Sequence, residues 1–345
     1  MNAPSSRTTG RALVTGATGF VGGWLTRRLV AEGVEVRILK RSPGPPADEL
    51  AGLPLDVRRG DVTDPDSVRA AVSGVDVVFH LAGLIAHSKA ERAAMQAVNV
   101  EGTRNVVEAC AHRAGPRLVH MSSVAALGAS FDGKRLLTEV STYNLDALHL
   151  AYFETKRDGE ALVLEAARAG RVQAVSINPG TVYGAGDARK GSRAAMLRVA
   201  RGTMPFFPPG GVNVVDVETV VDALIAADRL GRSGERYLVG GENLLLKTVF
   251  SLIARESGVK APAIGIPGAA LKVLGRIGDW RERRGRHGPL TSEAAWGAVL
   301  FHWFDSSKAR LEFGLRPRPA ASAIAASVRW SREQGLITNW GRPPG

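Results

Sequence analysis

The chain has 345 residues, of which 45% are hydrophobic and 23% charged, as in an ordinary soluble globular protein. This length predicts two domains or one large one, and the composition excludes disorder, collagen-like repeats and a coiled coil as its main character. The one cysteine, Cys110, excludes an intramolecular disulfide and a cysteine-rich zinc site. The net charge of +12 raises nucleic acid, anionic membranes and anionic ligands as partners, although a compositional bias toward arginine also explains it.

The first half of the chain alternates strand-like and helix-like segments. Short runs rich in β-branched residues predict strands at 12–15, 34–39, 57–59, 75–80, 118–121 and 174–177. Apolar periodicity predicts helices at 21–32, 65–73, 90–113 and 147–169. Continuous apolar runs are typical of strands buried on both faces of a parallel sheet. We therefore expect an α/β fold, a Rossmann-like doubly wound parallel sheet.

This alternation ends after Pro179. A glycine- and proline-rich stretch surrounds one predicted helix at 192–201, and residues 213–230 predict a strand that returns to the sheet, followed by a helix. Another strand is predicted at 236–241, and helical patterns dominate from Lys247 onward, which indicates a smaller, mostly helical C-terminal substrate domain. The expected division is a dinucleotide-binding domain at 10–180 and about 212–232, a substrate domain at about 181–211 and 233–338, and flexible tails at 1–9 and 339–345.

The first predicted strand runs into a glycine-rich turn with the sequence TGATGFVG, from Thr15 to Gly22. Three glycines suit a tight turn, a close approach of backbone amides to a pyrophosphate, and close packing of helix on strand. The N-terminus of the following helix adds a positive dipole and free N–H groups. We expect a dinucleotide to bind here, with a purely structural turn as the alternative.

The end of the second strand indicates which dinucleotide binds. An acidic residue there would accept from the ribose 2′-hydroxyl of NAD, whereas this strand ends in Lys40 and Arg41. A guanidinium can hold a 2′-phosphate with two hydrogen bonds, so we expect NADP(H) as the preferred cofactor, with NAD(H) still possible. The alternative is that both are solvated charges. Asp61, after the third strand, could accept from the adenine amino group or cap the helix that follows.

Tyr152 and Lys156 lie four residues apart on a predicted helix and therefore share one face. A lysine beside a phenol stabilises the phenolate and lowers the tyrosine pKa, which makes the tyrosine a usable general acid or base. The fifth strand ends in Met121-Ser122-Ser123, where a serine hydroxyl faces the crevice in which open α/β sheets bind ligands.

These landmarks together resemble the extended short-chain dehydrogenase/reductases of the NAD-dependent epimerase/dehydratase superfamily. The matching motifs occur in family order between residues 11 and 240: TGATGFVG, GDVTD, VFHLAG, NVEGT, HMSS, YFETK and NPG. The later segments GGVNVVDVETVVDAL, GERYLVGGENL and FDSSKARLEFGLRPR are similar to the branch of dihydroflavonol reductases and 3β-hydroxysteroid dehydrogenases.

The resemblance implies a role for each matching residue. Tyr152 would exchange a proton with the substrate oxygen, Lys156 would hold the nicotinamide ribose, and Ser123, rather than its neighbour Ser122, would bind the carbonyl. Asn99 would support a water-linked proton path to the lysine. The cofactor contacts that we expect are Gly16, Thr18, Gly19, Phe20, Val21 and Gly22 around the pyrophosphate, Lys40 and Arg41 at the 2′-phosphate, Asp61 and Val62 at the adenine, Leu81, Ala82 and Gly83 on the pocket wall, and Tyr152, Lys156 and Pro179 at the nicotinamide end.

The histidines show no metal-ligand spacing, so no metal site is expected. His80 and His120 lie in apolar strands, where hydrogen-bonded buried imidazoles are the expected arrangement. Two others, His87 and His149, lie nearer the predicted crevice and could touch substrate, and His112 lies at the end of a predicted helix.

Residues 264–288 combine apolar side chains with five arginines. A basic amphipathic helix that contains a tryptophan can lie at a membrane interface, whereas the alternative is a helix with one core face and one solvated face. No nucleic-acid recognition motif is present, so no nucleic-acid partner is expected. No run of about 18 apolar residues and no cleavable leader is seen, which predicts a cytoplasmic protein, with membrane association as a possibility.

The sequence therefore predicts an NADP(H)-dependent oxidoreductase that interconverts a ketone and a secondary alcohol by hydride transfer. The resemblance implies a small-molecule substrate that is lipid, steroid-like or a long-chain β-keto compound, and a homodimer formed through the helices at 90–113 and 147–169. One alternative is a nucleotide-sugar epimerase or dehydratase that recycles NAD. Another is a non-catalytic NADP-sensing module, against which the tyrosine–lysine pair argues.

Overall fold

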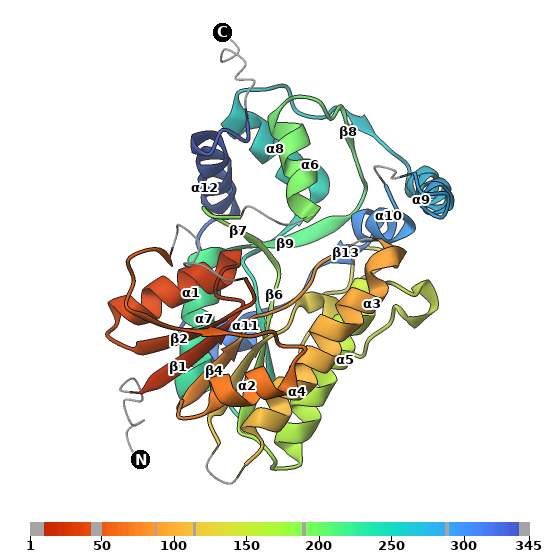
Figure 1. Cartoon of the computed structure of the whole chain (residues 1–345). Helices are drawn as coiled ribbons and strands as arrows, with labels where there is room; N and C mark the ends of the chain where they lie inside the picture. The colour runs from red at the N-terminus through yellow and green to blue at the C-terminus, as the bar shows by residue number, and fades with distance from the viewer. Residues whose placement is uncertain are drawn as a thin grey trace.

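The computed structural model of the chain describes residues 10–42, 50–86, 88–112, 115–187, 191–286 and 290–337. The predicted tails at 1–9 and 339–345, and His87, lie outside these ranges. Figure 1 shows a large lobe of strands flanked by helices, with a smaller lobe above it that carries α6, α8, α9, α10 and α12.

The large lobe contains a parallel sheet, as the sequence predicts. Its described strands follow the order β10-β6-β5-β4-β1-β2-β3, and every neighbouring pair is parallel. Starting at β1, the chain builds outward to β3 and then crosses back to place β4 on the other side, so the carboxyl ends of β1 and β4 form the switch point where such sheets bind ligands. The strands are β1 (Arg11–Thr15), β2 (Glu35–Lys40), β3 (Leu55–Arg59), β4 (Val77–His80), β5 (Arg117–Met121), β6 (Ala174–Pro179) and β10 (Arg236–Val239).

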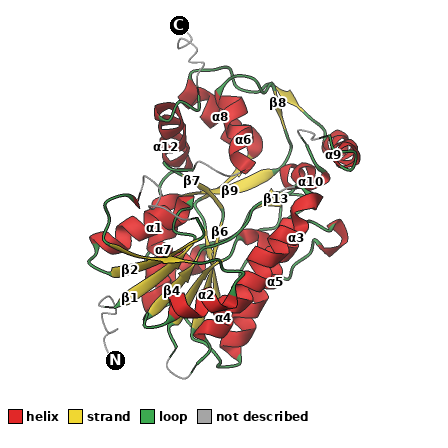
Figure 2. Ribbon diagram, in the orientation of Figure 1, coloured by secondary structure: helices red, strands yellow, loops and turns green. Residues whose placement is uncertain are grey.

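Helices cover both faces of this sheet (Figure 2). One layer contains α1, α7 and α11, which pack through a core that includes Leu25, Val220 and Phe313. The opposite layer contains α2, α4 and α5, which pack through Val68, Val106 and other aliphatic side chains. Two-sided burial explains why the strands have continuous apolar sequences. These helices are α1 (Phe20–Ala31), α2 (Pro65–Val72), α4 (Gly102–Cys110), α5 (Ala151–Arg168), α7 (Val217–Leu230) and α11 (Ser307–Phe313).

The predicted helix at 90–113 is helical as far as Cys110, but it is not α-helical throughout. A 3-10 turn leads into α3 (Arg92–Met95), a π-helical turn occupies Gln96–Glu101, and α4 follows. Gly159 of α5 packs directly on this turn, since a Cβ atom there would lie 2.3 Å from the Asn99 carbonyl oxygen. The wider turn presents Asn99 toward α5. Such π-helical turns are frequent at functional sites. Arg113 lies outside the described residues.

The helix predicted at 147–169 starts later than position 147. A 3-10 turn spans Asp146–Leu148, and His149 adopts the left-handed backbone conformation with φ 50° before α5 begins at Ala151. Apolar spacing continues through this turn, which is why the pattern predicts too long a helix.

The smaller lobe corrects the expected place of one strand. The strand expected to return to the large sheet is β9 (Gly211–Asp216), and it instead lies in a second sheet with order β11-β9-β13, where β7 also pairs with it. The large sheet is completed by β10, from the segment predicted as a further strand. The other strands are β7 (Thr181–Tyr183), β8 (Phe206–Phe207), β11 (Glu242–Leu245), β12 (Ile264–Gly265) and β13 (Phe301–His302).

Helices form most of the smaller lobe and enclose a core of its own. That core includes Met196, Phe250 and Ile324. Among the described helices, none is long and apolar enough to cross a membrane. The helices are α6 (Gly191–Ala200), α8 (Leu246–Ser257), α9 (Gly268–Glu282), α10 (Ser292–Val299) and α12 (Ala320–Glu333).

Candidate active site

The glycine turn joins β1 to α1 with very little space to spare. Gly16 adopts φ +75°, and a Cβ atom there would lie 2.7 Å from the Ala82 nitrogen at the end of β4. At Gly22, a Cβ atom would lie 2.1 Å from the Gly16 carbonyl oxygen. Gly19 caps α1, whose first turn contains no acidic residue, so its N–H groups face an electropositive space. Bare backbone at a helix N-terminus suits a pyrophosphate, and this half of the site fits a nicotinamide dinucleotide. Thr18 lies in the same turn, and Phe20 and Val21 are the first two residues of α1.

The ends of β2 and β3 bring a cation and an acid together. Arg41 is well exposed, and its Nε lies 3.9 Å from Asp61 Oδ2. Asp61 accepts from the backbone and hydroxyl of Thr63, whereas the α2 cap is Asp64, which accepts from the Asp66 nitrogen. The alternative in which Asp61 caps this helix is therefore wrong. Lys40 ends β2, and Val62 is buried beside Gly102 after β3.

The end of β4 lies against the π-helical turn. Asn99 Oδ1 accepts from the Leu84 nitrogen at 2.8 Å, and its Nδ2 donates to the Leu84 carbonyl and to Thr155 Oγ1. These contacts fix the segment after β4 that contains Leu81, Ala82 and Gly83. An added Cβ at Gly83 would lie 3.4 Å from Asn99 Oδ1 and 3.9 Å from Lys156 Nζ, so Asn99 and Lys156 border the same space.

Ser123 and Tyr152 come together at the carboxyl end of β5. Burial raises the pKa of the Tyr152 hydroxyl, a hydrogen bond with Ser123 lowers it, and the negative charge of Glu293 raises it. The net pKa shift is upward, opposite to the lowering expected from Lys156, because burial outweighs the favourable contacts. Ser123 Oγ also accepts from the Ala125 nitrogen, so this oxygen contacts both the phenol and the turn that follows β5. Ser122 points elsewhere.

Lys156 lies one turn beyond Tyr152 on α5. Its Nζ donates to the Met121 carbonyl oxygen at 3.1 Å. Burial lowers the pKa of this lysine to about 8, and the negative charge of Glu160 opposes that lowering. A lysine with a pKa near neutrality can pass a proton as well as hold a charge. Pro179, also buried, ends β6 at the same edge of the sheet.

A buried carboxylate that the sequence analysis missed lies beneath these residues. Glu160 Oε2 accepts from Ser122 Oγ and from Asn178 Nδ2, each at 2.5 Å, and its Oε1 lies 2.7 Å from Arg236 Nε. Asn178 also donates to the Ser123 carbonyl oxygen. Glu160 is four residues after Lys156, so the helical spacing that pairs Tyr152 with Lys156 could have revealed it.

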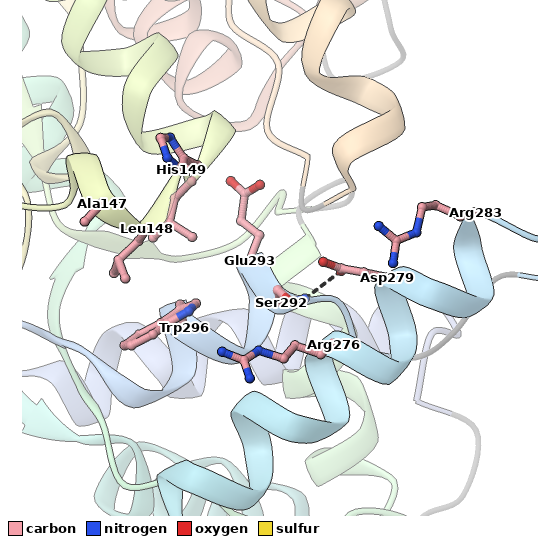
Figure 3. Close-up of a pocket in the computed structure, with 10 residues that line it drawn as sticks. Ala147, Leu148, His149, Arg276, Asp279, Arg283, Ser292, Glu293 and Trp296 are labelled. Carbon is pink, nitrogen blue, oxygen red and sulfur yellow. Dashed lines mark hydrogen bonds between the residues drawn. The ribbon is translucent and has the colours of Figure 1, made fainter.

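A second missed residue, Glu293, belongs to the smaller lobe. Its Oε1 accepts from the Tyr152 backbone nitrogen at 2.7 Å, and burial raises its pKa from 4.5 to about 7. Glu293 lines a pocket of about 480 Å³. Figure 3 shows it there with Trp296 of the same helix, Arg276 of α9 and Arg283, which directly follows α9. No local sequence signal marks this contact. The lining residues are Ala147, Leu148, His149, Leu150, Arg276, Asp279, Arg283, Ser292, Glu293 and Trp296.

The two strand histidines differ in their hydrogen bonds. His80 has a partner for each ring nitrogen, Thr15 Oγ1 at 2.7 Å and Thr103 Oγ1 at 3.0 Å, as expected for a buried imidazole. The ring of His120 stacks on that of His80, with 5.3 Å between the ring centroids. Neither ring nitrogen of His120 has a hydrogen-bond partner among the described residues, so the expectation of a hydrogen-bonded imidazole is wrong for His120. Burial lowers both pKa values, that of His80 to about 3. His112 lies exposed after α4.

In the described part of the chain, no three metal-ligating side chains come together. The residues that do converge are Ser123, Tyr152, Lys156 and Asn99, at the edge of the sheet where the glycine turn also lies. His149 is exposed and lines the pocket next to Glu293. A doubly wound sheet that carries a glycine turn and this tyrosine at one edge suits a nucleotide-dependent oxidoreductase.

Comparison with known proteins identifies the family. The model of the NAD dependent epimerase/dehydratase family matches residues 12–240, so the chain belongs to that family. A putative dihydroflavonol 4-reductase from Synechocystis is 33% identical over 94% of this chain and 95% of its own length. Sterol demethylase protein B from Methylococcus capsulatus is also 33% identical, over 94% of this chain and 99% of its own. A 2-alkyl-3-oxoalkanoate reductase from Stenotrophomonas maltophilia is 32% identical over 89% and 95%.

Solved structures agree with this assignment. The crystal structure of gox2253 superposes with a TM-score of 0.83 at 32% identity, covering 94% of this chain and 99% of that one. MoeE5, solved with UDP-glucose and NAD, shares the fold at 23% identity, with a TM-score of 0.71 over 94% and 99% of the two chains. The protein is thus an NAD(P)-dependent oxidoreductase of the extended short-chain dehydrogenase type, which confirms the resemblance.

Proposed function

We propose that the protein reduces a ketone to a secondary alcohol, or catalyses the reverse reaction, on a lipid, steroid-like or long-chain β-keto substrate. The observation that carries the proposal is the meeting of the Tyr152 hydroxyl with Ser123 beside a desolvated Lys156. Two relatives, which are named 2-alkyl-3-oxoalkanoate reductase and sterol demethylase protein B and match over at least 95% of their own length, support the substrate class.

Each residue has a defined task in this reaction. When bound, NADPH supplies the hydride to the carbonyl carbon. Ser123 donates a hydrogen bond to the carbonyl oxygen, and Tyr152 gives that oxygen its proton as negative charge develops there. Lys156 then returns a proton toward Tyr152 along a path that Asn99 borders. The raised pKa of Tyr152 keeps the phenol protonated at neutral pH, as a proton donor requires.

The test combines a substrate panel with a single substitution. Purified protein is assayed for NADPH consumption with 2-alkyl-3-oxo acids, 3-oxosteroids and nucleotide sugars. Tyr152→Phe should lower kcat roughly 10²–10⁴-fold on the active ketone, whereas Tyr143→Phe, a neighbouring tyrosine that packs under Arg157, should not. An unchanged rate in Tyr152→Phe would refute the mechanism.

The main alternative is a nucleotide-sugar epimerase or dehydratase, which recycles bound NAD. The neighbours solved with nucleotide sugars are less than 25% identical and share only the fold. Copurifying NAD, together with turnover of a nucleotide sugar and no net NADPH consumption, would favour this alternative.

NADP(H) is the proposed preferred cofactor. Arg41 supports it, because this exposed guanidinium directly follows β2, and β2 itself ends in Lys40 rather than in an acidic residue that would bind a 2′-hydroxyl. Arg41→Ala should lower kcat/KM for NADPH by roughly 10–100-fold, because it removes a charge-assisted bidentate contact with the 2′-phosphate. The kcat/KM for NADH should change little. Arg69→Ala, an exposed arginine on α2, is the matched control. A wild-type preference for NADH would overturn this part of the proposal.

We also infer that the protein works in the cytoplasm as a homodimer that touches a membrane surface through residues 264–288. Helices α4 and α5 are the proposed dimer contact, which sedimentation equilibrium of the purified chain would test. Residues 287 and 288 of the membrane segment lie outside the described ranges.

The shape of α9 supports the membrane contact. Its buried side is formed by Leu271, Gly275, Gly278 and Asp279, whereas Val273, Leu274, Ile277 and Trp280 are each about half exposed. α9 therefore has one buried face and one exposed face, as the alternative expects, but of its large apolar residues only Leu271 lies on the buried face. Exposed arginines without acidic partners among the described residues flank this ridge, which suits anionic lipid headgroups. They are Arg276, Arg281, Arg283 and Arg284.

Vesicle co-sedimentation tests the contact. The wild type should bind vesicles with 30–50% phosphatidylglycerol, a composition that we choose for its charge, and should bind neutral phosphatidylcholine vesicles less. The double variant Leu274→Ser, Ile277→Ser should lose binding but keep its activity on a water-soluble ketone. Leu311→Ser removes an exposed leucine on α11 and is the control. Equal binding by the α9 variant would refute the contact.

A further inference from the structure

The helix that carries Tyr152 and Lys156 has no cap from its own sequence. Leu150 occupies the N-cap position of α5 and makes no side-chain hydrogen bond there. The N–H groups of a first helical turn need acceptors from elsewhere. Glu293 supplies them, since its carboxylate accepts from the backbone nitrogens of Tyr152 and Ala151. The cap therefore comes from α10, 141 residues further along the chain.

The smaller lobe holds this carboxylate firmly. Glu293 is only 3% exposed. Thr291 caps α10 by accepting from the Ala294 nitrogen, and Asp279 of α9 accepts from the Ser292 nitrogen. Gly278 allows α9 to pack directly on the chain before α10, since a Cβ atom there would overlap the Leu290 carbonyl oxygen. Glu293 is therefore fixed from one side by its own lobe and binds α5 on the other.

Charged groups of both signs surround Glu293. Arg92 of α3 lowers its pKa, and Glu154 of α5 raises it. Facing it across the pocket are His149, from the turn before α5, Arg276 and Asp279 from α9, and Arg283, which directly follows α9 (Figure 3). Because burial dominates this balance, the carboxyl group titrates near neutral pH, and its negative charge acts on the Tyr152 hydroxyl.

We propose that Glu293 is a positioning residue: from α10, its carboxylate fixes the first turn of α5 and thereby sets the Tyr152 phenol against Ser123. The proposal rests on the proposed function of Tyr152 as the proton donor. It makes the smaller lobe part of the catalytic geometry, because misplacing a proton donor by about 1 Å can cost on the order of 10²-fold in rate.

Two substitutions separate positioning from simple stabilisation. Glu293→Ala removes the acceptor and should lower kcat roughly 10–100-fold, with KM changed less than threefold. Glu293→Gln keeps a carbonyl oxygen at the same place and should restore most of the lost kcat. Asp64→Ala removes the side-chain cap of α2, so it should lower the melting temperature and leave kcat unchanged. A wild-type kcat for Glu293→Ala, measured well below its melting temperature, would overturn the proposal.

The pH–rate profile gives a readout that a merely structural role would not move. Glu293→Gln removes a negative charge near the phenol, so the limb that reports Tyr152 should move to lower pH by about 1 unit. This variant also decides the matter if Glu293→Ala does not fold. An unmoved limb in a folded Glu293→Gln protein contradicts the proposal.

A spectroscopic titration keeps this inference separate from the proposed function. The chain has four tyrosines, so the difference in tyrosinate absorbance between each protein and its Tyr152→Phe counterpart reports Tyr152 alone. The Tyr152 titration should lie at lower pH in Glu293→Gln than in the wild type, whether or not any ketone is reduced. A shift without ketone reduction refutes the proposed function only, whereas ketone reduction without a shift refutes the place given to Glu293.

Discussion

The nucleotide side and the substrate side of the site are built over very different lengths of chain. All of the glycine turn lies within residues 15–22, and its close contacts are made among its own backbone atoms and the end of β4. The cap on α5 instead joins residues 141 positions apart, through a helix of the other lobe. A local motif can be recognised in sequence, whereas a contact between lobes exists only after both lobes have folded.

The comparison predicts that the nucleotide side tolerates the least change, and Gly22→Ala tests this most severely. The new Cβ atom would lie 2.1 Å from the Gly16 carbonyl oxygen, which is backbone and cannot turn away. We expect the free energy of unfolding to fall by about 2–3 kcal/mol. We also expect NADPH binding to weaken roughly 100-fold. Urea unfolding and fluorescence titration with NADPH measure the two effects.

Gly297→Ala is the matched control for this change in the smaller lobe. A Cβ atom at Gly297 in α10 meets nothing within 4 Å. Alanine there should stabilise the protein by about 0.5–1 kcal/mol, because it lowers the entropy of the unfolded chain. Equal changes in the free energy of unfolding of the two variants would show that the glycine turn is not specially constrained.

Much of the fold could be predicted from the sequence because its signals are local. The strands β1 to β6 and the helices α1 and α2 lie within a few residues of their predicted positions. Sequence does not show which sheet a strand joins, so β9 was expected in the wrong one. The π-helical turn at Gln96–Glu101 lies against Gly159, and periodicity along one helix does not contain such a contact.

The candidate site divides in the same way. The spacing of Tyr152 and Lys156 predicts a shared helix face, and the same spacing would have indicated Glu160 had it been extended by one turn. Glu293 has no such signal, since it lies in a short helix with an ordinary sequence. The pKa of Tyr152 was expected to fall because of one neighbour, but it depends on how deeply the whole fold buries the phenol.

The ionisation of Glu293 sharpens the comparison, since it should make the lobe contact depend on pH. Its pKa is about 7 in the folded protein against 4.5 for an ordinary glutamate. A raised pKa means that this group contributes its full stability below pH 4.5 and loses that contribution as the pH rises through 7. Glu293→Gln cannot ionise, so it should gain about 1–3 kcal/mol relative to the wild type between pH 4.5 and 8.

Urea unfolding of both proteins at several pH values measures this gain. Glu154→Gln is the control on α5, because it neutralises a neighbouring carboxylate that binds Arg92 but not the Tyr152 backbone. A stability difference between Glu293→Gln and the wild type that stays constant across this range would contradict the assigned pKa.

A last comparison lies within the large lobe, where two stacked and buried histidines differ in their hydrogen bonds. His80→Leu leaves the Thr15 and Thr103 hydroxyls without their ring partners, which should cost about 1–3 kcal/mol. His120→Leu removes two ring nitrogens that have no partner among the described residues, so it should change stability by less than about 1 kcal/mol, in either direction. Both rings are buried and the substitution is the same, so the comparison of the two unfolding free energies tests the hydrogen bonds of His80. Equal losses would mean that packing, rather than hydrogen bonding, sets the stability of this strand pair.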